Sequence, residues 1–144
     1  MELFTIGFTK TSAENFFNRL ESNEVKTLID VRLNNQSQLA GFAKSRDLEF
    51  FLKRMLNVGY EHQTLLAPTK ELLSAYRNKE IDWKSYETSF MDLIDGRSVA
   101  DILRKDDFIS ACLLCSEATA DQCHRHLVAD YLKEKWGDVN ITHL

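Results

Sequence analysis

Hydrophobic and polar positions along the chain follow two different spacings. Short, nearly continuous apolar runs at 3–8, 25–32 and 108–115 are typical of strands. Between them, apolar residues recur every three or four positions, which predicts helices that begin after Thr11, after Ser45 and at Ala120. Helices interrupted at Gly96 are predicted for 68–105, and shorter strands at 60–63 and 138–144.

This alternation of strands and helices predicts one α/β domain over residues 1–144, with a mostly parallel sheet flanked by helices. The apolar runs at 25–32 and 108–115 fit strands that are covered on both faces. Ligands of such sheets bind at the carboxyl ends of the strands. That rule selects Asp30 and Arg32 after the second strand, and Cys115 and Glu117 after the fourth.

Composition narrows the class of protein and its partners. A chain of 144 residues is long enough for one compact core, and its net charge of −4 argues against non-specific binding to duplex nucleic acid. No apolar run approaches the roughly 20 residues of a membrane helix, and the start lacks the features of a secretory signal. Three cysteines do not make a disulfide framework. We therefore expect a cytoplasmic protein with reduced thiols and no membrane partner.

The stretch CSEATADQCHRHLVADYL, residues 115–132, concentrates the polar chemistry of the chain. Thr119 and Gln122 fit a capping box, which would direct the free N–H groups of a first helical turn to the edge of the sheet. Arg125, together with Arg32 and Lys44, would then contact a phosphate group. In the structural alternative, Arg125 pairs with Glu117 or Asp30 and holds the loop in place.

Cys115 is a candidate nucleophile. A thiol at the end of a strand and facing a helix start would have its pKa lowered by the helix dipole and by a nearby guanidinium. His124 or Glu117 would then transfer the proton. The placement resembles that of rhodaneses and cysteine phosphatases, but the acidic Asp121 stands where their tight anion-binding loop ends. Cys115 is therefore either the nucleophile or part of the cleft wall.

A zinc site is the third interpretation of this stretch, because Cys112, Cys115, Cys123 and His124 are all suitable ligand types. Residues three apart on a strand point to opposite faces, so Cys112 and Cys115 should diverge. Cys112 is then expected to be a small core residue. On this argument we assign no metal and no cofactor.

Several segments resemble the domain of unknown function 488 family: TIGFT at 5–9, LIDVR at 28–32, GFAKSRDLEFFL at 41–52, and LLCSEATADQCHRHLVADYL at 113–132. The last segment has the most specific motif, a strand that ends in Cys-x-Glu, followed by Cys-His-Arg. The resemblance spans nearly the whole chain. It implies an α/β fold of Rossmann-like appearance and a cleft lined by Asp30, Arg32, Lys44, Cys115, Glu117, Cys123, His124 and Arg125. It implies no function.

Three functional hypotheses remain open at this point. The favoured one is a cleft that binds or processes a phosphorylated small molecule, a nucleotide or a nucleic-acid end. The second is a module without catalysis that binds single-stranded nucleic acid or a protein through Trp83, Tyr86 and Phe90, although their helical spacing favours core packing. The third is a metalloprotein that uses cysteine and histidine. The pattern does not predict an oligomeric state.

Overall fold

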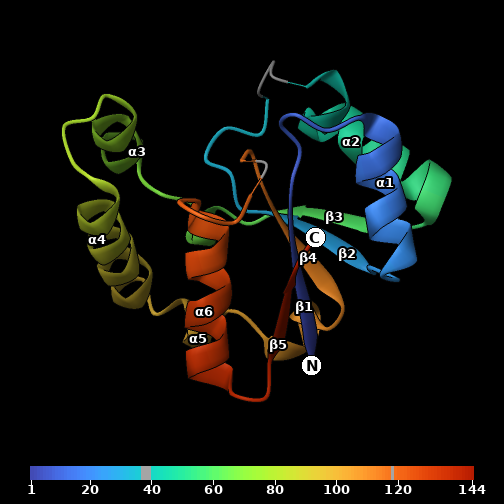
Figure 1. Cartoon of the computed structure of the whole chain (residues 1–144). Helices are drawn as coiled ribbons and strands as arrows, with labels where there is room; N and C mark the ends of the chain where they lie inside the picture. The colour runs from blue at the N-terminus through green and yellow to red at the C-terminus, as the bar shows by residue number, and fades with distance from the viewer. Residues whose placement is uncertain (37–39, 118) are drawn as a thin grey trace.

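A computed structural model of the protein describes residues 1–36, 40–117 and 119–144. Its five strands form one sheet in the order β3-β2-β4-β1-β5, and every neighbouring pair is parallel (Figure 1). This confirms the predicted α/β class with a parallel sheet. The strands are β1 (Glu2–Gly7), β2 (Thr27–Asp30), β3 (Gly59–His62), β4 (Ala111–Cys115) and β5 (Asn140–His143).

Helices cover both faces of this sheet (Figure 1). On one face lie α1 (Ala13–Ser22) and α2 (Ser45–Phe51), and α2 continues into a π-helical turn at Leu52–Leu56. The other face is covered by α4 (Trp83–Gly96), α5 (Val99–Ile102) and α6 (His124–Trp136), and α3 (Lys70–Arg77) packs against α4. Short 3-10 turns lie at Gly41–Ala43, Thr64–Leu66 and Lys105–Phe108. Within the described residues, no helix is long and apolar enough to span a membrane.

The central strand β4 supplies side chains to two separate cores. Cys112 and Leu114 pack with α1 and α2, whereas Leu113 and Cys115 pack with the helices of the opposite face. Successive residues of a strand point to opposite sides, so a continuously apolar strand is buried on both. This arrangement confirms that Cys112 and Cys115 diverge and that Cys112 is a core residue.

Two predicted helix starts are wrong in detail. Ser12, and not Thr11, caps α1, since its hydroxyl accepts a hydrogen bond from the backbone N–H of Asn15 at 3.1 Å. The last long helix begins at His124 and not at Ala120, so Thr119 and Gln122 do not form a capping box. The physical reason is the left-handed backbone of Gln122, with φ of 50°, which a right-handed helix does not tolerate.

The connections place a crevice between β2 and β4. The chain leaves β2 toward α2 on one face of the sheet, and it leaves β4 toward α6 on the other. Neighbouring strands whose connections diverge in this way leave open space at their carboxyl ends, which is where ligands of open α/β sheets bind. Arg32 follows β2 at this edge and Cys115 ends β4.

Candidate functional site

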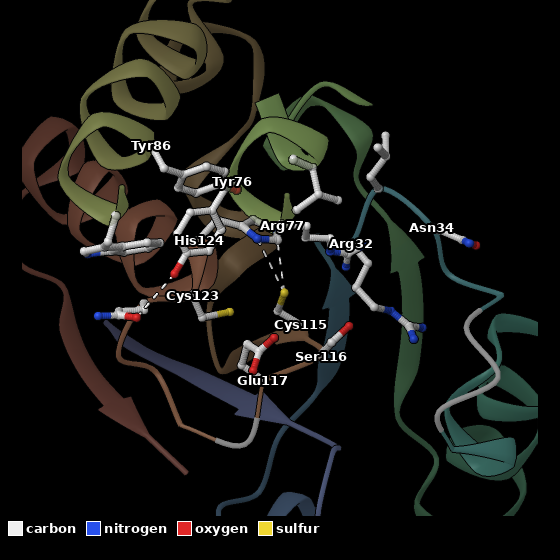
Figure 2. A pocket seen from close by; sticks show the side chains of 14 residues that line it. Arg32, Asn34, Tyr76, Arg77, Tyr86, Cys115, Ser116, Glu117, Cys123 and His124 are labelled. Atoms are coloured by element: carbon white, nitrogen blue, oxygen red, sulfur yellow. Dashed lines mark hydrogen bonds between the residues drawn. The ribbon is translucent and has the colours of Figure 1, made fainter. Parts of the chain in front are cut away.

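A pocket of about 480 Å³ opens at this edge of the sheet, a volume in the usual range for small-molecule sites (Figure 2). Its walls come from the segments that follow β2 and β4 and from α3, α4 and the start of α6. Four of the predicted site residues line it: Arg32, Cys115, Glu117 and His124. Asp30, Lys44 and Arg125, the other three, are not among its lining residues.

Cys115 and His124 lie side by side in the wall (Figure 2). The Cys115 sulfur is 3.5 Å from Nδ1 of His124. On the other side of the ring, Nε2 lies 2.7 Å from the backbone carbonyl oxygen of Val31. A carbonyl oxygen only accepts, so Nε2 carries the proton and donates it. In the neutral ring, Nδ1 is then a free acceptor, and the sulfur lies beside the ring, since it is also only 3.9 Å from Nε2.

A second thiol, Cys123, completes this cluster. The two sulfurs and a ring nitrogen of His124 all lie within 4.8 Å of one another. A hydrogen bond from the Cys123 thiol lowers the pKa of Cys115, and this effect outweighs the opposing effect of burial. The same hydrogen bond, together with burial, raises the pKa of Cys123 well above its usual value. The two thiols therefore shift the pKa of one another in opposite directions.

Arg32 is held from behind by Asp30. Its side chain is 2% exposed, and its Nε and Nη2 donate to the two Asp30 carboxylate oxygens at 2.8 and 2.7 Å. The Tyr60 hydroxyl donates to the same carboxylate at 2.6 Å. The oxygens of Asp30 thus accept hydrogen bonds from Arg32 and Tyr60, outside the pocket. Burial opposes the charge on Arg32, but the hydrogen bonds and charge of Asp30 outweigh it and raise the pKa of the guanidinium. Nη1 of Arg32 is buried without a hydrogen-bond partner among the described residues.

Arg125 lies inside the domain, with 0% of its side chain exposed. Its Nε donates to the Thr5 hydroxyl at 3.3 Å, and Nη1 donates to the backbone carbonyl of Glu117. Arg125 thus connects the loop after β4 to β1. It does so through the backbone carbonyl of Glu117, and not through the carboxylate of Glu117 or Asp30. Lys44 is half-buried just before α2, outside the pocket wall.

The sequence reasoning missed an aromatic wall formed by α3 and α4. Trp83 stacks on Tyr86, with ring centroids 5.3 Å apart, and meets Tyr76 edge-on at 5.7 Å. The Tyr76 hydroxyl donates to the side-chain oxygen of Gln122 at 3.3 Å, which joins α3 to the loop before α6. Helical spacing favours core packing for Trp83 and Tyr86, but it gives no sign that these two residues and Tyr76 line the pocket.

The aromatic side chains differ in how much of each is exposed to solvent. Tyr86 is 1% exposed and Phe90 0%, so both are unavailable for stacking on bases at the molecular surface. Trp83 and Tyr76 are only half-buried. Arg77, which follows Tyr76, is exposed and lines the same pocket. No local motif marks it, because its position depends on how α3 packs.

Comparison with known proteins identifies the family. A family model described as Domain of unknown function DUF488 matches residues 12–132, and the chain therefore belongs to this family. This confirms the family that the sequence resembles. Comparisons with curated proteins and with solved structures give no match.

Proposed function

We propose that this member of the DUF488 family binds and processes a phosphorylated small molecule of the nucleotide type in the pocket. One observation supports this most strongly. The half-buried ring of Tyr76 lies on one side of the Cys115–His124 pair and Arg32 lies on the other (Figure 2). A ligand with a flat ring at one end and a phosphate at the other matches this arrangement, and its central bonds would then face the reactive side chains.

Two guanidinium groups give the pocket hydrogen-bond donors for an anion. Arg32 and Arg77 line it with one acidic side chain, Glu117, and Asp30 balances the charge of Arg32 from outside the pocket. The guanidinium fork matches two oxygens of a phosphate group, and such charge-assisted hydrogen bonds are stronger than neutral ones. Arg77 is exposed, so it can meet a ligand without rearrangement of the core. Arg32 is already oriented by Asp30.

The aromatic wall favours a flat ring on the ligand. Trp83 and Tyr76 are half-buried, so part of each ring remains accessible, and Tyr86 supports Trp83 from behind. Stacking of a base on an aromatic side chain contributes about 1–3 kcal/mol. This contribution does not depend on which base is bound, and the aromatic wall alone therefore favours no particular nucleotide.

Processing would involve Cys115, His124 and Glu117. A thiol beside an imidazole that is itself oriented by a third group, here the Val31 carbonyl, is the arrangement of an activated nucleophile. Glu117 is exposed at the pocket and is available as a second proton carrier. A nucleic-acid end presents the same phosphate and base as a free nucleotide, so both fit this proposal.

Calorimetric titration of the metal-free protein with adenosine 5′-monophosphate, adenosine and inorganic phosphate tests the proposal. We expect the monophosphate to bind more tightly than either part alone. Arg77→Ala should weaken its binding about tenfold or more, because a hydrogen bond to a charged group contributes about 1.5–3 kcal/mol. Binding of adenosine should remain unchanged.

Lys84→Ala is the matched control, since it removes one positive charge from the neighbouring helix α4 at an exposed position outside the pocket wall. Trp83→Ala should weaken both adenosine and the monophosphate. Absence of binding by the monophosphate, or an equal effect of Lys84→Ala and Arg77→Ala, would overturn the proposal. A 5′-phosphorylated dinucleotide that binds more tightly than the mononucleotide would identify a nucleic-acid end as the preferred ligand of the same site.

A further inference from the structure

We propose that Cys115, Cys123 and His124 bind a divalent zinc-type metal ion and leave one coordination position open to the pocket. Each residue offers one ligand atom, and these two sulfurs and one nitrogen lie within 4.8 Å of one another. Two thiolates and one imidazole are a ligand set that zinc accepts, and three protein ligands with a free fourth position are typical of catalytic zinc. All three residues line the pocket.

The separation of the ligand atoms fits such an ion. A tetrahedral zinc ion with bonds of about 2.3 Å to sulfur and about 2.0–2.1 Å to nitrogen holds these two atoms roughly 3.6 Å apart. The Cys115 sulfur and Nδ1 of His124 are 3.5 Å apart. Nε2 is farther from the sulfur, at 3.9 Å, and is occupied by the Val31 carbonyl. Nδ1 is therefore the ligand atom, and the ring must turn to direct its Nδ1 lone pair at the ion, because the sulfur now lies almost equally far from both nitrogens.

The surroundings of His124 match those of a metal-binding histidine. Such a histidine usually donates its second ring N–H to a carboxylate, a backbone carbonyl or water, which fixes the tautomer and the ring orientation. The 2.7 Å contact from Nε2 to the Val31 carbonyl supplies this partner. The Phe90 ring packs against the imidazole in a T-shaped arrangement, with centroids 5.4 Å apart.

A buried guanidinium lies beside the second sulfur of the set. Arg125 is fully buried, and among the described residues its polar contacts are the Thr5 hydroxyl, the Glu117 carbonyl and the Cys123 sulfur at 3.9 Å. A thiolate at Cys123 would attract this guanidinium, and the ion would balance the charge of the two thiolates. Binding of the ion replaces both thiol protons, which leave to solvent, and turns both sulfurs into thiolates. The site then also accounts for Cys123, which a single nucleophile at Cys115 does not require.

This set of ligands does not include Cys112. As the sequence predicts, Cys112 and Cys115 point to opposite faces of the sheet. Cys123 and His124 reach Cys115 because the loop before α6 turns back at Gln122, whose φ is positive. With the ion bound, Cys115 and His124 are ligands and no longer nucleophile and base, and the open position would instead expose a bound ligand to a Lewis acid or to a metal-activated water. That last role rests on the proposed function, whereas metal binding does not.

Cobalt titration of the reduced, metal-free full chain tests the site. Thiolate ligands to Co²⁺ produce a charge-transfer band in the near ultraviolet, and four-coordinate Co²⁺ has intense visible bands. We expect one equivalent of Co²⁺ to produce both signals and Zn²⁺ to abolish them. Cys115→Ser, Cys123→Ser and His124→Asn should each weaken cobalt binding by on the order of 100-fold or more, since loss of a second-shell partner alone costs 10–100-fold.

Cys112→Ala is the matched control, because it removes a buried cysteine from the other face of β4 and should leave both signals intact. Circular dichroism of each variant separates loss of a ligand from loss of the fold, and the wild-type titration is decisive even if every ligand variant unfolds. Absence of the thiolate band in the wild type would overturn the site. So would alkylation of Cys115 at the same rate with and without Zn²⁺. Because the nucleotide titration uses metal-free protein and Arg77, its outcome is independent of this one.

Discussion

Gly7, the last residue of β1, lies directly against the backbone carbonyl of Glu117. A Cβ atom at Gly7 would overlap this carbonyl oxygen and would come within 2.8 Å of Nη1 of Arg125. Only glycine permits so close an approach of two backbones. The position of the loop that carries Glu117 and leads to Cys123 therefore requires a residue without a side chain at Gly7 in β1.

The first prediction concerns this contact. Gly7→Ala should lower the free energy of unfolding by about 1–3 kcal/mol or more, the usual cost of forcing atoms into a packed interior. It should also displace the loop and weaken cobalt and nucleotide binding together. Urea denaturation and the two titrations measure these effects. Gly96→Ala is the control, because a Cβ there meets nothing within 4 Å. A Gly7→Ala protein as stable as Gly96→Ala would contradict the packing argument.

Arg125→Ala should destabilise the protein rather than simply remove a ligand contact. The substitution leaves the Glu117 carbonyl without its donor and opens a cavity beside Thr5. We expect a loss on the order of 3 kcal/mol in urea denaturation. Arg77→Ala, at an exposed position, should change stability by less than about 0.5 kcal/mol. If Arg125→Ala abolished phosphate binding with no loss of stability, Arg125 would be a direct ligand after all.

The sequence predicts those features of the fold and the site whose signal lies within one short segment of the chain. The apolar runs identified the strands, because a strand buried on both faces is apolar along its whole length, whichever elements pack against it. The strand-end rule then found Arg32, Cys115 and Glu117, since parallel strands bring their carboxyl ends to one edge. Helix starts are predicted less accurately. The start of α6 depends on the left-handed backbone of Gln122, and no residue type in the sequence marks that turn.

The remaining features of the site depend on long-range packing. An arginine is usually exposed, so nothing local indicated that Arg125 would be fully buried while Arg77 would stand at the pocket. The aromatic wall forms only when α3 and α4 pack over the edge of the sheet. The proximity of Cys123 to Cys115 likewise depends on the path of one loop. The spacing of the cysteines along the chain does not indicate that path.

A third prediction follows from the buried pair that Asp30 makes with Arg32. Asp30→Asn would leave the Arg32 charge buried without its counter-charge, and removal of one partner of such a pair costs about 3–5 kcal/mol. Replacing both with apolar residues, as in Asp30→Leu with Arg32→Met, should recover part of the loss. A double-mutant cycle in urea, completed by the two single substitutions, measures the coupling. Tyr60→Phe removes one hydrogen bond to Asp30 and should cost only about 1 kcal/mol. Strict additivity of the cycle would contradict the pairing.

The last prediction concerns the helix that carries Trp83 and Tyr86 into the pocket. Asp82 caps α4, and its carboxylate accepts a hydrogen bond from the Ser85 N–H at 2.8 Å. This hydrogen bond lowers the pKa of Asp82 below its ordinary value. A lowered folded-state pKa means that the extra stability is fully present above the ordinary pKa of about 3.9 and is lost as the pH falls through the folded-state pKa.

The midpoint of thermal unfolding should therefore be higher for the wild type than for Asp82→Asn at pH 7. The difference should shrink steadily as the pH falls below about 3.9. Asparagine keeps a capping oxygen but has no charge to lose, so the comparison isolates the ionised carboxylate. Glu87→Gln, on an exposed turn of the same helix, controls for the loss of one negative charge. A difference between wild type and Asp82→Asn that stays constant down to low pH would show that the Asp82 charge does not stabilise the start of α4.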